Sequence, residues 1–188
     1  MKSGFVAIVG RPNTGKSTLI NSLVGQKIAI TSHHPNTTRH AIRGILNGAD
    51  YQAVLVDTPG IHKPRTLLGE RLNEVVNENL EAVDLIIMTM PANEVVGAGD
   101  EHILNLIHNS KAKKIAVLTK IDTVSKEKTP ERLLEIGALA NWDEIVPVSA
   151  IKSIQIPTLQ ELISKYLPEG PKLYPDNQSS DQSQERLI

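Results

Sequence analysis

The feature that most constrains this chain is a glycine-rich segment near its start. Residues 10–17 read GRPNTGKS and match the pattern G-x-x-x-x-G-K-[ST]. An apolar run at residues 5–9 precedes the segment, and a helical pattern over residues 16–23 follows it. A strand, a glycine-rich turn and a helix in this order direct successive backbone N–H groups toward one point, where they can bind an anion. The segment therefore predicts an α/β fold with a phosphate-binding loop.

Short apolar runs alternate with helical patterns along most of the chain. The other runs that predict strands lie at residues 41–46, 53–56, 85–89, 115–118 and 145–148. Helical periodicity is present near residues 68–76, 103–107, 129–134 and 159–166. Several of the apolar runs are continuous, which is typical of strands in a parallel sheet that is buried on both faces.

Composition limits the classes of protein open to this chain. Its 188 residues include 20 Lys+Arg and 21 Asp+Glu, for a net charge of -1, and 40% of them are hydrophobic. These values exclude disorder throughout and argue against nucleic-acid binding by charge alone. Without cysteine, a thiol nucleophile and a Cys-type zinc site are also excluded. The apolar runs are far shorter than the roughly 18 residues that span a bilayer.

We expect a cytoplasmic protein. Peripheral association with the inner membrane is left open as an alternative.

The composition changes after residue 167. Pro168, Pro171 and Pro175 come in quick succession, and residues 177–184 contain no apolar side chain. Such a stretch is typical of a linker or a frayed terminus. We therefore expect one domain over residues 1–167 and a Pro-rich, polar linker or disordered tail over residues 168–188.

The glycine-rich loop has an expected role at each main position. Gly10 and Gly15 let the backbone curl around a phosphate, Lys16 would reach the β- and γ-phosphates, and the Ser17 hydroxyl would ligate Mg²⁺. We expect nucleotide contacts from the whole stretch of Gly10, Arg11, Pro12, Asn13, Thr14, Gly15, Lys16, Ser17 and Thr18. The alternative is a glycine-rich turn that binds nothing, and the strand and helix around the loop argue against it.

A second polar segment, Asp57-Thr58-Pro59-Gly60, follows the apolar run at residues 53–56. Asp57 then lies at the carboxyl end of a strand, where open α/β sheets bind ligands, and can hold Mg²⁺ through a water. Gly60 has no side chain to block a γ-phosphate, so its N–H could bind that group. A β-turn without a ligand is the alternative for an isolated D-x-x-G.

Two further strands end in polar segments at the same edge. The segments are Thr119-Lys120-Ile121-Asp122 and Ser149-Ala150-Ile151. Asp122 can accept hydrogen bonds from both N1–H and N2–H₂ of guanine, a pair of donors that adenine lacks. Lys120 would lie along the face of the base, and the Ala150 N–H could bind the guanine O6. These residues favour guanine as the base.

Taken together with the threonine-containing stretch at residues 36–40, these segments look like the five sequence elements of translation-factor-class GTPases. Within that class, residues 10–13, 35–40 and 57–62 closely resemble the Era family, and the resemblance covers about residues 5–175. It implies a Ras-like fold, with a mostly parallel six-stranded sheet, one antiparallel strand at residues 41–46 and helices on both faces.

The same resemblance implies slow hydrolysis of GTP by a switch in assembly of the small ribosomal subunit and maturation of 16S rRNA. In that family a C-terminal KH domain contacts the RNA, and no helix-GxxG-helix segment follows residue 168 here. We therefore expect this chain to keep the nucleotide chemistry and to lack specific RNA binding, with ribosomal RNA and the small ribosomal subunit as partners of the full-length protein. We also expect a monomer.

The resemblance also implies the parts of a catalytic site. Thr38 is the expected switch threonine that reaches Mg²⁺ beside Ser17 and Asp57, with Thr37 as the alternative. The expected catalytic residues are Lys16, Thr38, Gly60 and Asn13. In related members, an Asn at the position of Asn13 helps to hold a potassium ion beside the phosphates. Mg²⁺ is thus the expected cofactor of GTP and GDP, and K⁺ is hypothesised as a second cation.

Two positions depart from the pattern of these families. Ras-like enzymes have a Gln that orients the attacking water at the position of Ile61. In this respect the chain resembles the subset of GTPases that have a hydrophobic residue at this position. Ile61 therefore leaves open the alternative of a non-catalytic binding module, in which GTP binding only orders the switch segments. Thr119 stands where the base-binding element usually begins with Asn, and we expect a loss of about 1 kcal/mol in nucleotide affinity with guanine specificity retained. A P-loop ATPase is a further alternative, against which Asp122 argues.

Overall fold

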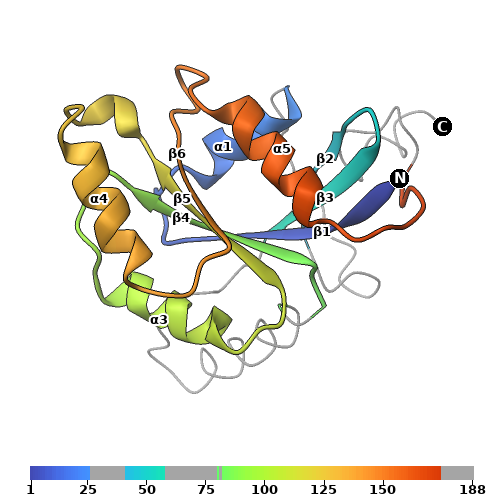
Figure 1. Cartoon of the computed structure of the whole chain (residues 1–188), viewed down its shortest axis with the longest axis horizontal. Coiled ribbons are helices and arrows are strands. Elements are labelled where there is room, and N and C mark those ends of the chain that lie inside the picture. The colour runs from blue at the N-terminus through green and yellow to red at the C-terminus, as the bar shows by residue number, and fades with distance from the viewer. Residues whose placement is uncertain (26–40, 58–79, 81, 175–188) are drawn as a thin grey trace.

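The computed structural model describes residues 1–25, 41–57, 80 and 82–174. Its elements are β1 (Lys2–Val9), α1 (Lys16–Val24), β2 (Ala41–Asn47), β3 (Tyr51–Asp57), β4 (Leu85–Pro91), α3 (Ala98–His108), β5 (Lys113–Thr119), the 3₁₀ turn η1 (Ile121–Thr123), α4 (Lys128–Gly137), β6 (Glu144–Pro147) and α5 (Ile156–Tyr166) (Figure 1). Each strand predicted from the sequence is present. The helix predicted at residues 68–76 lies outside the described residues.

The strands form one six-stranded sheet in the order β2-β3-β1-β4-β5-β6. β1 lies at the centre and pairs in parallel with β3 and β4, and Val6 lies opposite both Leu55 and Leu85. β2, the strand predicted at residues 41–46, pairs antiparallel with β3, and every other pairing among the described strands is parallel. The mostly parallel Ras-like sheet is confirmed, and its parallel strands all direct their carboxyl ends to the same edge.

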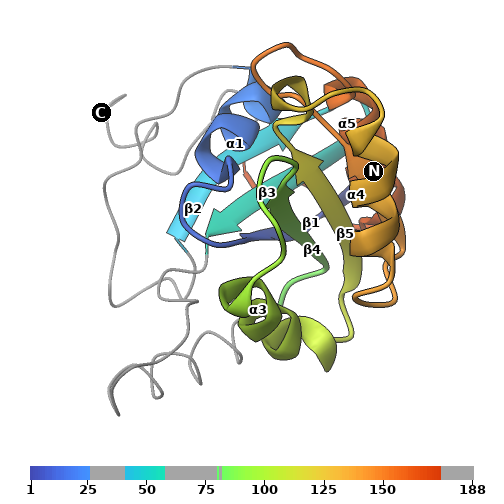
Figure 2. The ribbon, with the colours of Figure 1, turned by 90° about the vertical axis from the view of Figure 1, so that its left-hand side faces the viewer.

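Helices cover both faces of the sheet, as predicted (Figure 2). On one face, α1 and α5 pack against inward side chains of the strands, and Val6 and Ile8 belong to this cluster. On the other face, α3 and α4 pack against Ala7 and Val9. Alternate residues of β1 thus enter opposite cores, as the two-residue period of a strand requires. None of the described helices is long and apolar enough to cross a membrane.

Residues 168–174 return to the end of the sheet opposite the glycine-rich loop. Ser3 Oγ donates a hydrogen bond to the Pro171 carbonyl at 2.6 Å. Gln52, which is fully buried in β3, accepts from Tyr174 N at 3.0 Å and donates from Nε2 to Tyr174 O at 2.8 Å. The division between a domain and a linker after residue 167 stays a prediction, and these bonds attach the first residues beyond that boundary to β1 and β3.

Candidate nucleotide-binding site

The glycine-rich loop joins β1 to α1 at the carboxyl edge of the sheet. It borders an open cavity of about 440 Å³. The lining residues are Pro12, Asn13, Gly15, Lys16, Ser17, Thr18 and Lys120. The structure therefore brings the predicted phosphate-binding loop together with the predicted base-binding segment, although about 100 residues separate them in the sequence.

Two glycines give the loop its shape. Gly15 is the N-cap of α1 and has a φ of 98°, a left-handed conformation that favours glycine. Gly10 has a φ of 156°, and a Cβ atom there would lie only 2.2 Å from Thr89 Oγ1 and 3.0 Å from the Thr89 carbonyl oxygen. Gly10 is thus required by the close approach of the loop to β4 as well as by its backbone conformation.

Lys16 folds back over the loop that precedes it. Its Nζ donates hydrogen bonds to the carbonyl oxygens of Gly10 at 2.5 Å and Arg11 at 3.3 Å. These bonds keep the ammonium group beside the mouth of the loop, where a phosphate would bind. The position suits a lysine that neutralises phosphate charge.

Ser17 has the chemistry that a Mg²⁺ ligand needs. Its hydroxyl oxygen accepts a hydrogen bond from Arg43 Nη2 at 3.0 Å. A lone pair of this oxygen therefore points at the guanidinium cation of Arg43 in β2. Mg²⁺ prefers such hard oxygen ligands together with phosphate oxygens. Asp57 ends β3 with its backbone in register with Ile8, on the same edge of the sheet.

The Arg11 side chain turns away from the cavity toward α3. Arg11 Nε donates to Asp100 Oδ1 at 2.8 Å, and Asp100 is only 1% exposed. The other carboxylate oxygen, Oδ2, accepts from Gly97 N at 3.0 Å at the start of α3. Any contact of Arg11 with a nucleotide would therefore come from its backbone, and its guanidinium instead ties the loop to α3.

Thr119 and Lys120 attach the base-binding segment to the phosphate-binding loop. Thr119 is buried, and its hydroxyl donates to the Thr14 carbonyl at 2.5 Å. Lys120 has a left-handed φ of 60° and donates from Nζ to the Asn13 carbonyl at 2.7 Å. The hydroxyl of Thr119 thus holds the loop, a role that the sequence did not reveal.

Asp122 is held from the neighbouring loop. Ser149 Oγ donates to Asp122 Oδ1 at 2.7 Å, and Lys152 N donates to Ser149 Oγ at 3.2 Å. A carboxylate has about four acceptor positions, so one such bond leaves capacity for the two donors of guanine. Ala150 is the next residue in this loop, and the side chain of Ile151 is 78% exposed.

Several predicted site residues lie outside the described part of the chain. These are Thr37, Thr38, Gly60 and Ile61. Two residues with structural roles at the site, Thr89 and Asp100, were missed by sequence reasoning. Neither belongs to a recognisable motif, because each meets the loop only through the fold.

Residues 5–120 match the family described as "50S ribosome-binding GTPase". This match covers more than half of the chain. The chain belongs to this GTPase family. It is also similar to curated proteins named GTPase Era. The relative from Corynebacterium diphtheriae is 50% identical over 190 residues, which are 100% of this chain and 62% of that protein. The relative from Mycolicibacterium smegmatis is 50% identical over 190 residues, covering 100% and 64%.

Solved structures of Era are similar to this GTPase-family chain in fold. An Aquifex aeolicus Era variant bound to GDP·AlF4⁻ has a TM-score of 0.80 and 38% identity, over 96% of this chain and 62% of that one. An Era structure in complex with MgGDPNP and nucleotides 1506–1542 of 16S ribosomal RNA gives the same values. The FeoB G-domain from Methanococcus jannaschii, at a TM-score of 0.61 and 21% identity, shares the fold. The chain spans about three fifths of the length of the curated Era relatives.

Proposed function

We propose that this chain binds GTP and GDP with Mg²⁺ and hydrolyses GTP to GDP and phosphate. The observation that carries the proposal is the attachment of the segment that contains Asp122 to the glycine-rich loop. Ser149 fixes the carboxylate at 2.7 Å, and Lys120 of the same segment is bonded to Asn13 of the loop at 2.7 Å. Lys120 lines the same cavity as the phosphate-binding loop, and Asp122 lies two residues further along the same segment. Similarity to proteins named GTPase Era supports the same function.

The proposed binding roles follow from the chemistry of each residue. The loop N–H groups and Lys16 bind the phosphates, and Ser17 and Asp57, with Thr38, hold Mg²⁺. When bound, Mg²⁺ would supply positive charge to the phosphate oxygens. The N–H of Gly60 would bind the γ-phosphate and register its loss. In this proposal Arg43 leaves Ser17 when the cation binds.

Catalysis in this proposal depends on Asn13 rather than on a water-orienting Gln. Ile61 has no polar group to orient a water, so developing charge on the phosphates needs another source of stabilisation. Asn13 lines the cavity in a left-handed conformation, with a φ of 65°. We propose that its carboxamide helps to hold a potassium ion there. Without such help we expect turnover on the order of 10⁻³ per second or slower.

The cellular role that we propose is a nucleotide switch in assembly of the small ribosomal subunit and maturation of 16S rRNA. Support comes from the similar Era structure in complex with nucleotides 1506–1542 of 16S ribosomal RNA. In this proposal the chain is monomeric, acts in the cytoplasm and provides the nucleotide-dependent part of that switch. The near-neutral charge of the chain argues against RNA binding by charge alone.

GTP turnover by the purified chain tests this function. It should be measured with Mg²⁺ in matched potassium and sodium buffers, with ATP as the control substrate and Lys16→Ala as the inactive control. We expect GTP hydrolysis that potassium stimulates, and no ATP hydrolysis. Equal turnover in sodium and potassium would contradict the role of Asn13. Tight GDP binding without turnover would instead indicate a nucleotide-gated binding module.

A further inference from the structure

Thr89 is a polar residue in the most buried strand of the sheet. All seven residues of β4 are buried, and Thr89 is 0% exposed. A hydroxyl in such surroundings is destabilising unless it forms hydrogen bonds. Thr89 Oγ1 lies 2.8 Å from Thr14 Oγ1 in the phosphate-binding loop and 3.2 Å from the carbonyl oxygen of Val9. The hydroxyl of Thr89 therefore contacts the loop from the side of the sheet.

The protons of the two threonines give this contact a direction. Each hydroxyl has one proton to donate, whereas a carbonyl oxygen only accepts. Thr14 Oγ1 lies 2.9 Å from the Arg11 carbonyl, which is shorter than the 3.2 Å between Thr89 Oγ1 and the Val9 carbonyl. The two shortest contacts are both satisfied when Thr89 donates to Thr14 and Thr14 donates to Arg11. A chain of hydrogen bonds thus runs from β4 to the backbone of the loop.

This chain ends at a backbone group that also positions Lys16. The Arg11 carbonyl accepts from Lys16 Nζ at 3.3 Å as well as from Thr14 Oγ1. The carbonyl of Thr14 is held separately, by the Thr119 hydroxyl at 2.5 Å. The side chain and the carbonyl of Thr14 are therefore fixed from different strands. Loss of either bond should let the loop relax away from the curvature that a phosphate needs.

We propose that Thr89 is a positioning residue of the nucleotide site. Through Thr14 it fixes the curvature of the phosphate-binding loop and the location of Lys16 before a nucleotide binds. This inference rests on the proposed function, because it assigns Thr89 to the phosphate side of the same site. Thr89 lies behind the loop and acts on the nucleotide only through Thr14.

GDP titration by calorimetry, with Mg²⁺ present, tests the proposal on the whole chain. Thr89→Val keeps the shape of the side chain and removes the donor, so we expect the Kd for GDP to rise about threefold to tenfold. Thr89→Ser restores the hydroxyl and should stay within about twofold of the parent chain. Ser3→Ala, which removes a buried hydroxyl at the opposite end of the sheet, is the matched control and should leave the Kd unchanged.

A double variant tests whether Thr89 acts through Thr14. We expect Thr14→Val with Thr89→Val to bind GDP as weakly as Thr14→Val alone, because the first substitution already breaks the hydrogen-bond chain. Additive losses would overturn the proposal. If Thr89→Val does not fold, Thr14→Val is compared with the parent in its place, and an unchanged Kd there overturns the proposal equally.

The same titrations separate this inference from the proposed function. If the parent chain binds no GDP, the proposed function fails. If the parent binds GDP and Thr89→Val binds it equally well, only the positioning role fails. A loss in Thr89→Val that Thr89→Ser does not restore also overturns the role, since it would reflect packing rather than the hydroxyl.

Discussion

At the scale of single residues, Thr119 stands where the base-binding element usually begins with Asn, and its hydroxyl has a defined partner in the structure. The sequence predicts that a threonine here weakens nucleotide binding, because its hydroxyl is shorter than a carboxamide. In the structure the Thr119 hydroxyl donates to the Thr14 carbonyl, so it reaches the phosphate-binding loop in spite of its length. An asparagine has more donors and acceptors than a threonine and could keep this bond while making another.

Thr119→Asn is therefore expected to bind GDP about fivefold more tightly than the parent chain, which corresponds to about 1 kcal/mol. Thr119→Val, which loses the bond to Thr14, should bind GDP about threefold to tenfold more weakly. Calorimetry measures both. Unchanged or weaker binding by Thr119→Asn would contradict the first expectation.

Gly10 supports a second prediction at this scale, because both its conformation and its surroundings exclude a side chain. Gly25 is a matched control, since it also has a positive φ, of 82°, but a Cβ there would meet nothing within 4 Å. We expect Gly10→Ala to lower the free energy of unfolding by about 1 to 3 kcal/mol more than Gly25→Ala does. Urea unfolding of the two variants checks this, and equal losses would show that the contact with Thr89 is not tight.

At the scale of elements, the centres of the strands were predictable and their ends were not. Apolar runs marked the middle of each strand, but β1 begins at Lys2 and β3 at Tyr51, before their apolar runs start. These first residues are extended because Lys2 pairs with Tyr51 across the sheet. Such pairing depends on the fold rather than on local sequence.

The candidate site likewise has parts that were predictable from the sequence and parts that were not. The positions of the two candidate segments at the carboxyl ends of strands were predictable, because each follows an apolar run and has a local motif, and their binding roles remain predictions. The partners that hold these segments were not predictable. Asp100 lies 89 residues from Arg11, and Thr89 lies 75 residues from Thr14. Neither spacing is a signal until the sheet brings the residues together.

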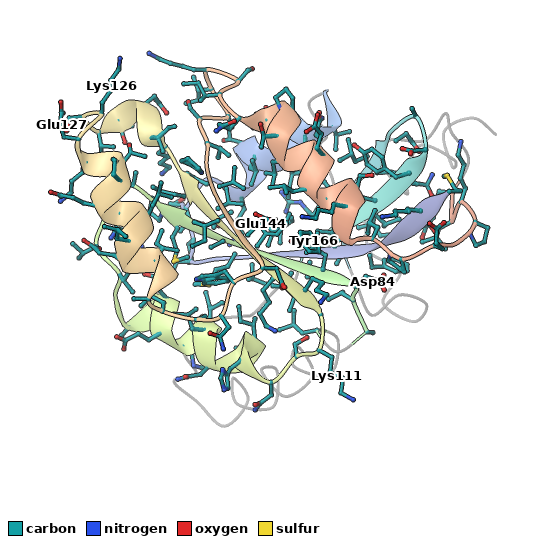
Figure 3. All side chains as sticks on the ribbon, viewed as in Figure 1. Asp84, Lys111, Lys126, Glu127, Glu144 and Tyr166 are labelled. Atoms are coloured by element: carbon teal, nitrogen blue, oxygen red, sulfur yellow. The ribbon has the colours of Figure 1, made fainter. Side chains whose placement is uncertain are left out.

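The ion pair between Arg11 and Asp100 gives a prediction for α3. Replacement of Arg11 by Met would leave a buried carboxylate with the Gly97 N–H and without its cation. We expect a loss of about 1.5 to 3 kcal/mol in the free energy of unfolding. Lys111→Met, at an exposed position, removes the same charge and should change stability little (Figure 3). Chemical denaturation compares them, and equal stability of the two variants would contradict a structural role for the pair.

At the scale of the whole molecule, the two ends of the parallel strands carry different features. The carboxyl ends of the parallel strands present the candidate nucleotide site. The opposite end receives residues 168–174, through Ser3 and Gln52. Tyr166 at the end of α5 lies beside Glu144 at the start of β6, where its hydroxyl donates to Glu144 Oε1 at 2.9 Å (Figure 3). This end of the sheet therefore holds the first residues of the chain together with residues 168–174.

Two tyrosines make the stability of the molecule sensitive to alkaline pH. Burial, with the nearby Asp50 carboxylate, raises the pKa of Tyr51 above 10.0, and the hydrogen bond to Glu144 raises that of Tyr166. The unfolded chain thus loses these protons at lower pH than the folded chain. Their contribution to stability is complete below about pH 10 and falls as the pH rises through and beyond that value.

Urea unfolding at pH 8 and at about pH 10.5 checks this dependence. The parent chain should lose more stability between the two values than Tyr51→Phe, which has no phenolic proton to lose at this position. An equal loss in both proteins would show that Tyr51 does not contribute.

The most direct test of the central claim is a comparison of GDP and ADP binding to this chain in the presence of Mg²⁺. Two charge-assisted hydrogen bonds from guanine to Asp122 are worth about 3 to 6 kcal/mol in total. GDP should therefore bind at least about a hundredfold more tightly than ADP, and Asp122→Ala should remove most of that preference. Equal affinity for the two nucleotides, or tighter binding of ADP, would contradict a guanine site and favour a P-loop ATPase.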